Sequence, residues 1–355
     1  MEGRFDAPHT SHMPLFKKQF AGGCEIGQLL PSGKDVASRA GRTLRTAYFD
    51  GGPLGPLHHH AIHVHSTNIP RTLETAYFAA AAAAPGLSHH ETVTLHTANI
   101  ATDPWKPPAD CSSAQTSLTA LQEGALATVR GQQGYMDFAA RWREATGLSF
   151  TPTFAAETGS NYDCVLLSRC EDLEMPPGVT EELQEEALEW AHRYIATAYY
   201  HSSTTKLLAR RMLRTMHDQS REKAKLALWV THDAGVLYLL SGLDVWNTVF
   251  PAYAEMVTFE IYHARGGGEL VRVLRRGEPV LVPGCGDELC EAAVFWGLLG
   301  DLEDDSECSQ PFVAEVLSEP LPPVAVLAVG LLAGVLGTVA VLRRPRAGDH
   351  YRRLV

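Results

Sequence analysis

The sequence lacks several features that would place it in a common class of proteins. Its formal net charge is −11, so it has no excess of positive charge, which argues against nucleic acid as the main partner. Its seven cysteines show no spacing typical of a zinc site. Internal repeats and Asn-x-Ser/Thr glycosylation acceptors are absent, and residues 1–20 contain no apolar core of a signal peptide. What remains is a chain of 355 residues, 45% of them hydrophobic, which is enough for one large domain.

The cysteines suggest disulfides rather than a metal site. Cys285 and Cys290 are close enough along the chain for a local bridge, and Cys111 and Cys308 could close a long loop. We therefore expect an oxidising compartment, with at least one thiol left over.

Charge is also absent from residues 324–342, a run of 19 residues rich in Val, Leu, Ala and Gly. Such a run nearly matches a hydrocarbon core about 30 Å thick, and the arginines that follow it mark the C-terminal side as cytoplasmic. The pattern predicts a stalk at 316–323, one transmembrane helix at 324–342 and a cytoplasmic tail at 343–355. In that tail, Tyr351-x-x-Leu354 has the form of a sorting signal that clathrin adaptors read.

Hydrophobic periodicity predicts an α/β domain over residues 23–315, after an irregular segment at 1–22. Strands are expected at 61–65, 92–100 and 226–230, and a hairpin at 256–263 and 270–275. Helices are expected at 33–49, 74–84, 118–146, 181–217 and 236–243. This order indicates an α/β core with a helical insertion at about 112–218. The acidic run 301–307 is expected to be a solvated surface segment.

A polar triplet follows the apolar strand 226–230 directly. Thr231, His232 and Asp233 come at its carboxyl end, where open α/β sheets bind ligands. A His-Asp pair there can offer an imidazole to an anion and a carboxyl group as a proton donor. The alternative is that Asp233 merely caps the next helix while His232 packs beside it.

Five separated stretches resemble the histidine acid phosphatase family, of the membrane-bound, lysosomal or prostatic type. They are the Gly-Gln-Leu-Leu segment at 27–30, His-Ser-Thr-Asn-x-x-Arg-Thr-Leu at 65–73, Thr-His-Asp at 231–233, the Pro-Ala-Tyr-Ala to Phe-Glu-Ile-Tyr stretch at 251–262, and the late hairpin with its cysteines at 272–290. They occur in the order that the family shows, over roughly residues 24–315.

The resemblance implies a phosphoglycerate-mutase-like, histidine phosphatase α/β fold and two-step phosphomonoester hydrolysis. A histidine attacks phosphorus to form a phosphohistidine, arginines neutralise the phosphate oxygens, and an aspartic acid protonates the leaving alcohol. By position, His232 would touch the phosphate and Asp233 would donate the proton, with His65 and Arg71 on the substrate-binding segment. No metal or cofactor is needed. The family also implies a homodimer and a lumenal or extracellular domain, in an endosome, a lysosome or at the cell surface.

The sequence departs from the family at the nucleophile. The Arg-His-Gly-x-Arg-x-Pro motif is absent, and no Arg-His pair occurs in the chain. His65 stands where the family has an arginine, and a histidine lacks the planar bidentate fork. His65 belongs to a cluster with His58, His59, His60 and His63 that could bind metal or face solvent. Two interpretations stay open: an acid phosphatase whose N-terminus is truncated, or a catalytically inactive pseudophosphatase that acts in binding or trafficking at a membrane.

Overall fold

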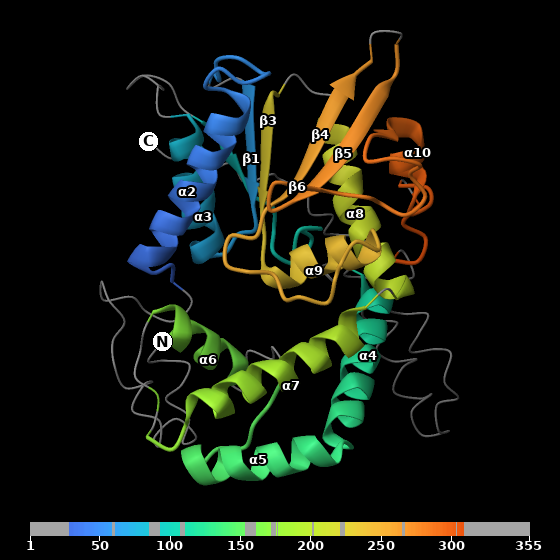
Figure 1. The fold of residues 1–355 in the computed structure, drawn as a ribbon. Helices are drawn as coiled ribbons and strands as arrows, with labels where there is room; N and C mark the ends of the chain where they lie inside the picture. The colour runs from blue at the N-terminus through green and yellow to red at the C-terminus, as the bar shows by residue number, and fades with distance from the viewer. Residues whose placement is uncertain are drawn as a thin grey trace, which may run out of the picture.

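The computed structural model describes residues 28–308 of the chain, apart from 59–60, 85–92, 107–110, 153–160, 172–174, 176, 201, 221–223, 265–266 and 303. Figure 1 shows an α/β half at the top and a helical half below it.

The α/β half contains a parallel sheet of three strands. Strand β1 (Ile62–Ser66) lies between β2 (Leu95–His96) and β3 (Leu226–Val230). Ser66 pairs with Val230, so β1 and β3 end at the same edge. Helix α3 (Pro70–Ala83) follows β1, and its small buried alanines pack on the buried side chains of that strand. The chain segments that leave β1 and β3 therefore begin side by side, where a site can form.

Helix α2 (Pro31–Tyr48) packs closely on α3. A Cβ atom at Gly41 would lie 2.1 Å from the carbonyl oxygen of Ala79, so only glycine permits this approach of the two backbones. At the other end of α2, the hydroxyl of Tyr48 donates a hydrogen bond of 2.7 Å to Glu260. Helix α2 thus links the parallel sheet to a second sheet.

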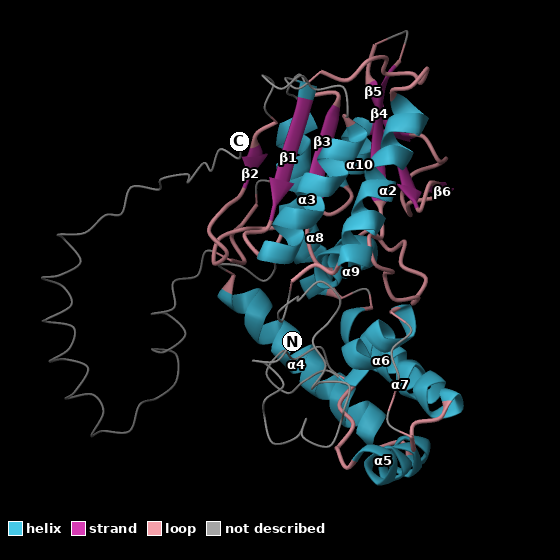
Figure 2. Cartoon of the chain, turned by 90° about the vertical axis from the view of Figure 1, so that its left-hand side faces the viewer, coloured by secondary structure: helices cyan, strands magenta, loops and turns pink. Residues whose placement is uncertain are grey.

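The second sheet is antiparallel and separate from the first. Strand β4 (Val257–His263) pairs with β5 (Glu269–Arg275), which pairs in turn with β6 (Glu278–Val280) and β7 (Cys290–Glu291). Helix α10 (Ala292–Gly297) follows β7. Figures 1 and 2 both show β3 and β4 standing apart.

The helical half is built around an aromatic core. Its helices are α4 (Ser112–Arg130), α5 (Gln133–Thr146), α6 (Asn161–Cys170) and α7 (Glu181–Tyr199), and α8 (Ser203–Ser220) continues into the α/β half (Figure 1). Phe138, Trp142 and Phe150 are almost fully buried, and the ring of Phe150 meets each of the other two edge to face. Thr180 caps α7 by accepting a hydrogen bond from the Leu183 amide.

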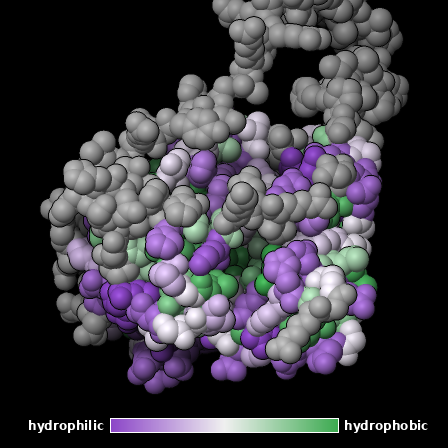
Figure 3. Space-filling model, turned by 90° about the horizontal axis from the view of Figure 1, so that it is seen from above, coloured by the Kyte–Doolittle hydropathy of each residue, from purple (hydrophilic) through white to green (hydrophobic). Residues whose placement is uncertain are grey.

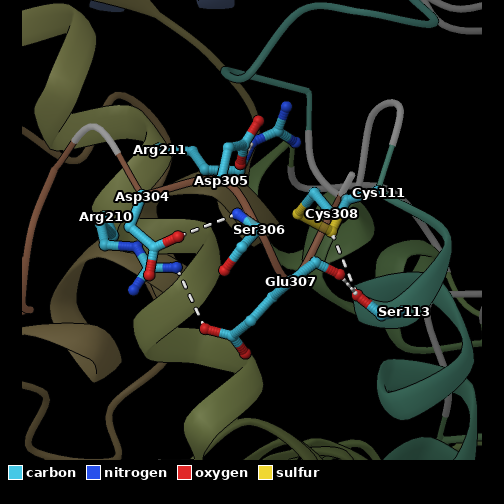
Figure 4. The surroundings of a disulfide bond; sticks show 9 residues. All are labelled: Cys111, Ser113, Arg210, Arg211, Asp304, Asp305, Ser306, Glu307 and Cys308. Carbon is cyan, nitrogen blue, oxygen red and sulfur yellow. Dashed lines mark hydrogen bonds and ion pairs between the residues drawn. A yellow bond between two sulfur atoms is a disulfide. The ribbon is translucent and has the colours of Figure 1, made fainter. Parts of the chain in front are cut away.

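Both predicted disulfides are confirmed. Cys285 bonds to Cys290, and Cys111 bonds to Cys308 across 197 positions of sequence. Figure 4 shows the second bridge beside α8, where Arg210 pairs with Glu307 at 3.1 Å and Arg211 pairs with Asp305 at 3.2 Å. The acidic run 301–307 therefore does more than face solvent, because two of its carboxylates fasten the run to α8.

The observed elements follow the predicted order with local differences. Strand β3 has the predicted bounds, whereas the strand expected at 92–100 is reduced to the two residues of β2. The helical regions expected at 118–146 and 181–217 are each two helices. Helix α9 (Asp233–Gly242) begins at the aspartate rather than at residue 236. Helix α6 was not predicted. The predicted domain boundaries remain a prediction.

The predicted fold class needs one correction. An α/β domain is present, but no helix within residues 28–308, as far as they are described, is long and apolar enough to cross a membrane. The helices of 18 or 19 residues, α2, α4, α7 and α8, are amphipathic and carry charged side chains. The span predicted at 324–342, together with its stalk and its tail signal, lies outside the described residues.

Candidate active site

The candidate site lies where β1 and β3 end. His232 is the N-cap residue of α9 and has extended backbone angles, and Asp233 is the first residue of the helix. The turn that leads into α9 is tight, since a Cβ atom at Gly235 would lie 2.5 Å from the hydroxyl of Thr231. Thr231 in turn donates a hydrogen bond to the carbonyl oxygen of Trp105. The predicted pair is therefore held between its own helix and the loop that follows β2.

Both ring nitrogens of His232 have partners from the segment that follows β1. The Nη2 atom of Arg71 lies 3.2 Å from Nδ1, and the Oγ1 atom of Thr67 lies 3.2 Å from Nε2. Because a guanidinium can only donate, Nδ1 must accept, and Nε2 then carries the proton and donates to Thr67. The partners of His232 thus select a neutral imidazole with the proton on Nε2.

The electrostatic surroundings also favour a neutral His232. Burial, followed by the positive charges of Arg71 and Lys106, lowers the pKa of His232 from 6.5 to about 4, and the carboxylate of Asp103 opposes this shift. At pH 5 the ring is therefore mostly unprotonated. In the ligand-free protein it therefore acts as a hydrogen-bonding group rather than as a cation.

Asp233 has the opposite tendency. Part of the residue is exposed to solvent, but protein surrounds the carboxyl group closely enough that the loss of hydration raises its pKa. The Ala234 amide, which donates to Oδ1 at 2.7 Å, and the charge of Arg71 lower that pKa by less. A carboxyl group with a raised pKa retains its proton to higher pH, as a general acid must.

His65 is engaged by a buried carboxylate. Its Nε2 atom lies 3.2 and 3.3 Å from the two carboxylate oxygens of Asp103, whose side chain is fully buried. Asp103 also accepts a hydrogen bond of 2.9 Å from the Trp105 amide. His65 lies on β1 one pair before Ser66 and Val230, next to the site, but Asp103 holds its ring.

The histidine cluster shows no metal centre in the described part of the chain. No group of three or more His, Cys, Asp or Glu side chains is placed there to hold a metal ion. His63 instead stacks on His96, with 4.6 Å between the ring centroids. His59 and His60 lie outside the described residues.

Sequence reasoning missed part of the site. Thr67, Asp103 and Lys106 were not proposed, although all three follow carboxyl ends of the parallel strands β1 and β2. The rule that loops at this edge converge could have found them, if the short strand β2 had been placed correctly. Their contribution is to orient the two histidines and to add positive charge.

Comparison with known proteins bears out the resemblance that the motifs indicated. The chain is 26% identical over 321 residues to prostatic acid phosphatase of Mus musculus, with 82% of this chain and 81% of that protein covered. It is 23% identical over 311 residues to lysophosphatidic acid phosphatase type 6 of Mus musculus, with 81% and 71% covered. It is also 23% identical over 288 residues to lysosomal acid phosphatase of Homo sapiens, with 73% and 66% covered. No family model matches the chain.

Solved structures give the same fold. A phytase of Hafnia alvei in complex with myo-inositol hexakis sulphate aligns with a TM-score of 0.60 at 15% identity, covering 83% of this chain and 92% of that one. A phytase of Klebsiella sp. ASR1 aligns with a TM-score of 0.59 at 17% identity, covering 86% and 92%. The curated relatives of this chain are histidine acid phosphatases, which are phosphomonoesterases, and its structural neighbours are phytases of the same fold.

Proposed function

We propose that the site at the ends of β1 and β3 binds the phosphate group of a phosphomonoester and that Asp233 protonates the leaving oxygen during hydrolysis through a phosphohistidine. One observation carries this proposal: a neutral histidine flanked by Arg71 lies directly beside a carboxyl group whose pKa is raised. Anion binding and proton donation are two of the three tasks that this reaction requires, the third being attack of a histidine on phosphorus. The acid phosphatases among the relatives favour the same chemistry.

Arg71 would move only a short way to act. It is exposed and reaches the site edge from the first turn of α3, where it now donates to Nδ1 of His232. An incoming phosphate oxygen can take over that donor, because a charge-assisted hydrogen bond to an anion is stronger than one to a neutral ring. Nδ1 of His232 is then freed to gain a proton and to donate to the same phosphate.

The test is hydrolysis of a generic aryl phosphate at about pH 5 by the full chain. Asp233→Asn should reduce turnover by about 10²–10⁴-fold while phosphate still binds, since only the proton donor is removed. Asp244→Asn makes the same chemical change just beyond the far end of α9 and should leave turnover unchanged. Equal turnover in the wild type and Asp233→Asn would contradict the assigned role. Acid-labile phosphate on a histidine, detected by mass spectrometry of quenched protein, would support the two-step route.

A pseudophosphatase is the second candidate. It is favoured by the missing Arg-His-Gly-x-Arg-x-Pro motif and by His65, which pairs with Asp103 where the family has an arginine. Phosphate binding by folded protein, with no hydrolysis above that of Asp233→Asn, would support this candidate. Failure to bind phosphate would exclude both.

We also place the domain in a lumenal or lysosomal space. The two disulfides need an oxidising compartment, and lysosomal acid phosphatases are among the relatives. The homodimer and the adaptor signal at Tyr351 and Leu354 remain predictions.

A further inference from the structure

His65, at the position where the histidine acid phosphatases carry an arginine, supplies no net positive charge to the site. Its Nε2 atom faces both carboxylate oxygens of Asp103 at 3.2 and 3.3 Å, and the side chain of Asp103 is fully buried. A neutral ring carries no charge, and the charge of a protonated ring is balanced by that carboxylate. A bound phosphate group therefore needs a cation from elsewhere, in addition to Arg71.

The loop that follows β2 brings a lysine to the same end of the sheet. Lys106 closes a turn, since its amide donates a hydrogen bond of 2.9 Å to the carbonyl oxygen of Asp103. The carbonyl group of Trp105, which is bonded directly to the amide nitrogen of Lys106, accepts a hydrogen bond from Thr231. Thr231 directly precedes His232. The backbone of Lys106 thus lies beside the strand end that carries His232.

This loop is held in place by buried side chains. The carboxylate of Asp103 accepts a hydrogen bond of 2.9 Å from the amide of Trp105. The indole of Trp105 donates a hydrogen bond of 2.8 Å to Thr215 on α8, and its ring stacks on Trp229 of β3 with 5.6 Å between the centroids. The backbone position of Lys106 is therefore set before a ligand arrives, so binding does not have to order the loop.

The side chain of Lys106 can reach an anion in the site. It is partly exposed, and no carboxylate in the described part of the chain pairs with its ammonium group. Its charge acts on His232, because it lowers the pKa of that ring in addition to burial and Arg71. An ammonium group has three donors on a flexible stem and can meet a phosphate oxygen without the planar geometry that a guanidinium requires.

We propose that Lys106 binds the phosphate oxygens in place of the family arginine, from the loop after β2 instead of from β1. Arg71, at the start of α3, and Lys106 then each bring one positive charge to the anion. The inference rests on the proposed phosphate site but not on hydrolysis, so it applies to an active phosphatase and to a pseudophosphatase alike.

The test measures the Kd of inorganic phosphate for the full chain by titration calorimetry at pH 5. Lys106→Met removes the charge but keeps an unbranched stem, and it should raise the Kd about ten- to a hundredfold, as the loss of a hydrogen bond to a charged group does. Lys106→Arg keeps the charge and should recover most of the lost affinity. Circular dichroism of each variant checks that it is folded.

Lys225→Met is the matched control and should leave the Kd unchanged. Lys225 is exposed and directly precedes β3, where its ammonium group donates to the carbonyl oxygen of Leu54 at 2.8 Å. The parallel strands run downward in Figure 2, so Figure 3 looks down on their amino ends, opposite to the site. Five residues at about 3.3 Å each give about 17 Å between the ends of β3, about twice the distance over which physiological salt screens a charge.

Two further measurements separate the charge of Lys106 from a general change of structure. In Lys106→Met, the pKa of His232 followed by NMR should rise above its wild-type value of about 4, because one of the charges that lower it is gone. His65→Gln keeps a donor towards Asp103 but cannot carry a charge, and it should raise the Kd of phosphate less than Lys106→Met does.

The outcomes distinguish this inference from the proposed function. Equal phosphate affinity of the wild type and Lys106→Met would overturn the inference and leave the phosphate site standing. A greater loss in His65→Gln than in Lys106→Met would also overturn it, because the charge would then come from the position of the family arginine. A wild type that binds no phosphate would exclude the proposed function and the inference with it.

Discussion

Anion binding at His232 should depend steeply on pH. In the free protein the ring is neutral, with a pKa of about 4, because it is buried and lies beside Arg71 and Lys106. We expect a bound tetrahedral anion to draw Arg71 away and to make a second donor at Nδ1 favourable, so the anion should bind the protonated ring best. The apparent Kd then equals the intrinsic Kd divided by the protonated fraction of His232.

The magnitude follows from that pKa. With a pKa of about 4, the protonated fraction is about one half at pH 4, about 9% at pH 5 and about 1% at pH 6. The Kd should therefore rise about fivefold between pH 4 and 5 and about tenfold between pH 5 and 6. Inorganic sulfate is a suitable ligand for titration calorimetry, since its own charge is constant over this range.

Two variants separate the titrating groups. His232→Asn should give a Kd that varies little with pH, because the ring that takes up the proton is gone. In Asp233→Asn the Kd should rise with pH as steeply as in the wild type, which would show that the carboxyl group of Asp233 does not cause the pH dependence. A flat Kd in the wild type, or a full slope in His232→Asn, would refute the reasoning.

Three further predictions concern stability. Cys308→Ser should lower the free energy of unfolding by about 5 kcal/mol and Cys290→Ser by about 2 kcal/mol in urea titrations, because the first bridge closes a far longer loop. Gly41→Ala should cost about 1–3 kcal/mol in the same assay, since its methyl group would meet the backbone of α3, and an unchanged urea midpoint would argue against that close contact. The pKa of His232 in the folded protein lies below its unfolded value of 6.5, so protonation on going to lower pH favours the unfolded state. The free energy of unfolding should therefore fall by about 3 kcal/mol between pH 6.5 and pH 4 because of this group. His232→Asn should lack this loss when unfolding is followed by circular dichroism.

The sequence predicted best where a local pattern decides the structure. Strand β3 has the predicted bounds because five consecutive apolar residues admit few alternatives. The break between α7 and α8 was missed because the residues around 200–202 include no proline or glycine, so the helical pattern runs through. Periodicity finds elements, but it says little about where a tertiary contact interrupts them.

In the candidate site, too, the residues in a local pattern were predicted and the contacts between distant parts of the chain were not. His232 and Asp233 were found because they directly follow a strand of five apolar residues. The contact of Arg71 with His232 joins residues 161 positions apart, and that of His65 with Asp103 depends on the loop after a two-residue strand. The separation of β3 from β4 was not foreseen either, since a strand pattern does not reveal which strand lies beside it.

The bridge between Cys111 and Cys308 also determines how the domain would carry mechanical load. Tension applied to the chain beyond Cys308 passes straight across the sulfur–sulfur bond to Cys111, at the start of α4. Residues 112–307 lie inside this covalent loop, so the covalent path of that tension bypasses them. A pull from the C-terminal side would reach the helical half, β3 and the β4–β5 hairpin only through noncovalent contacts, such as the pairing of β3 with β1, until the bond is reduced.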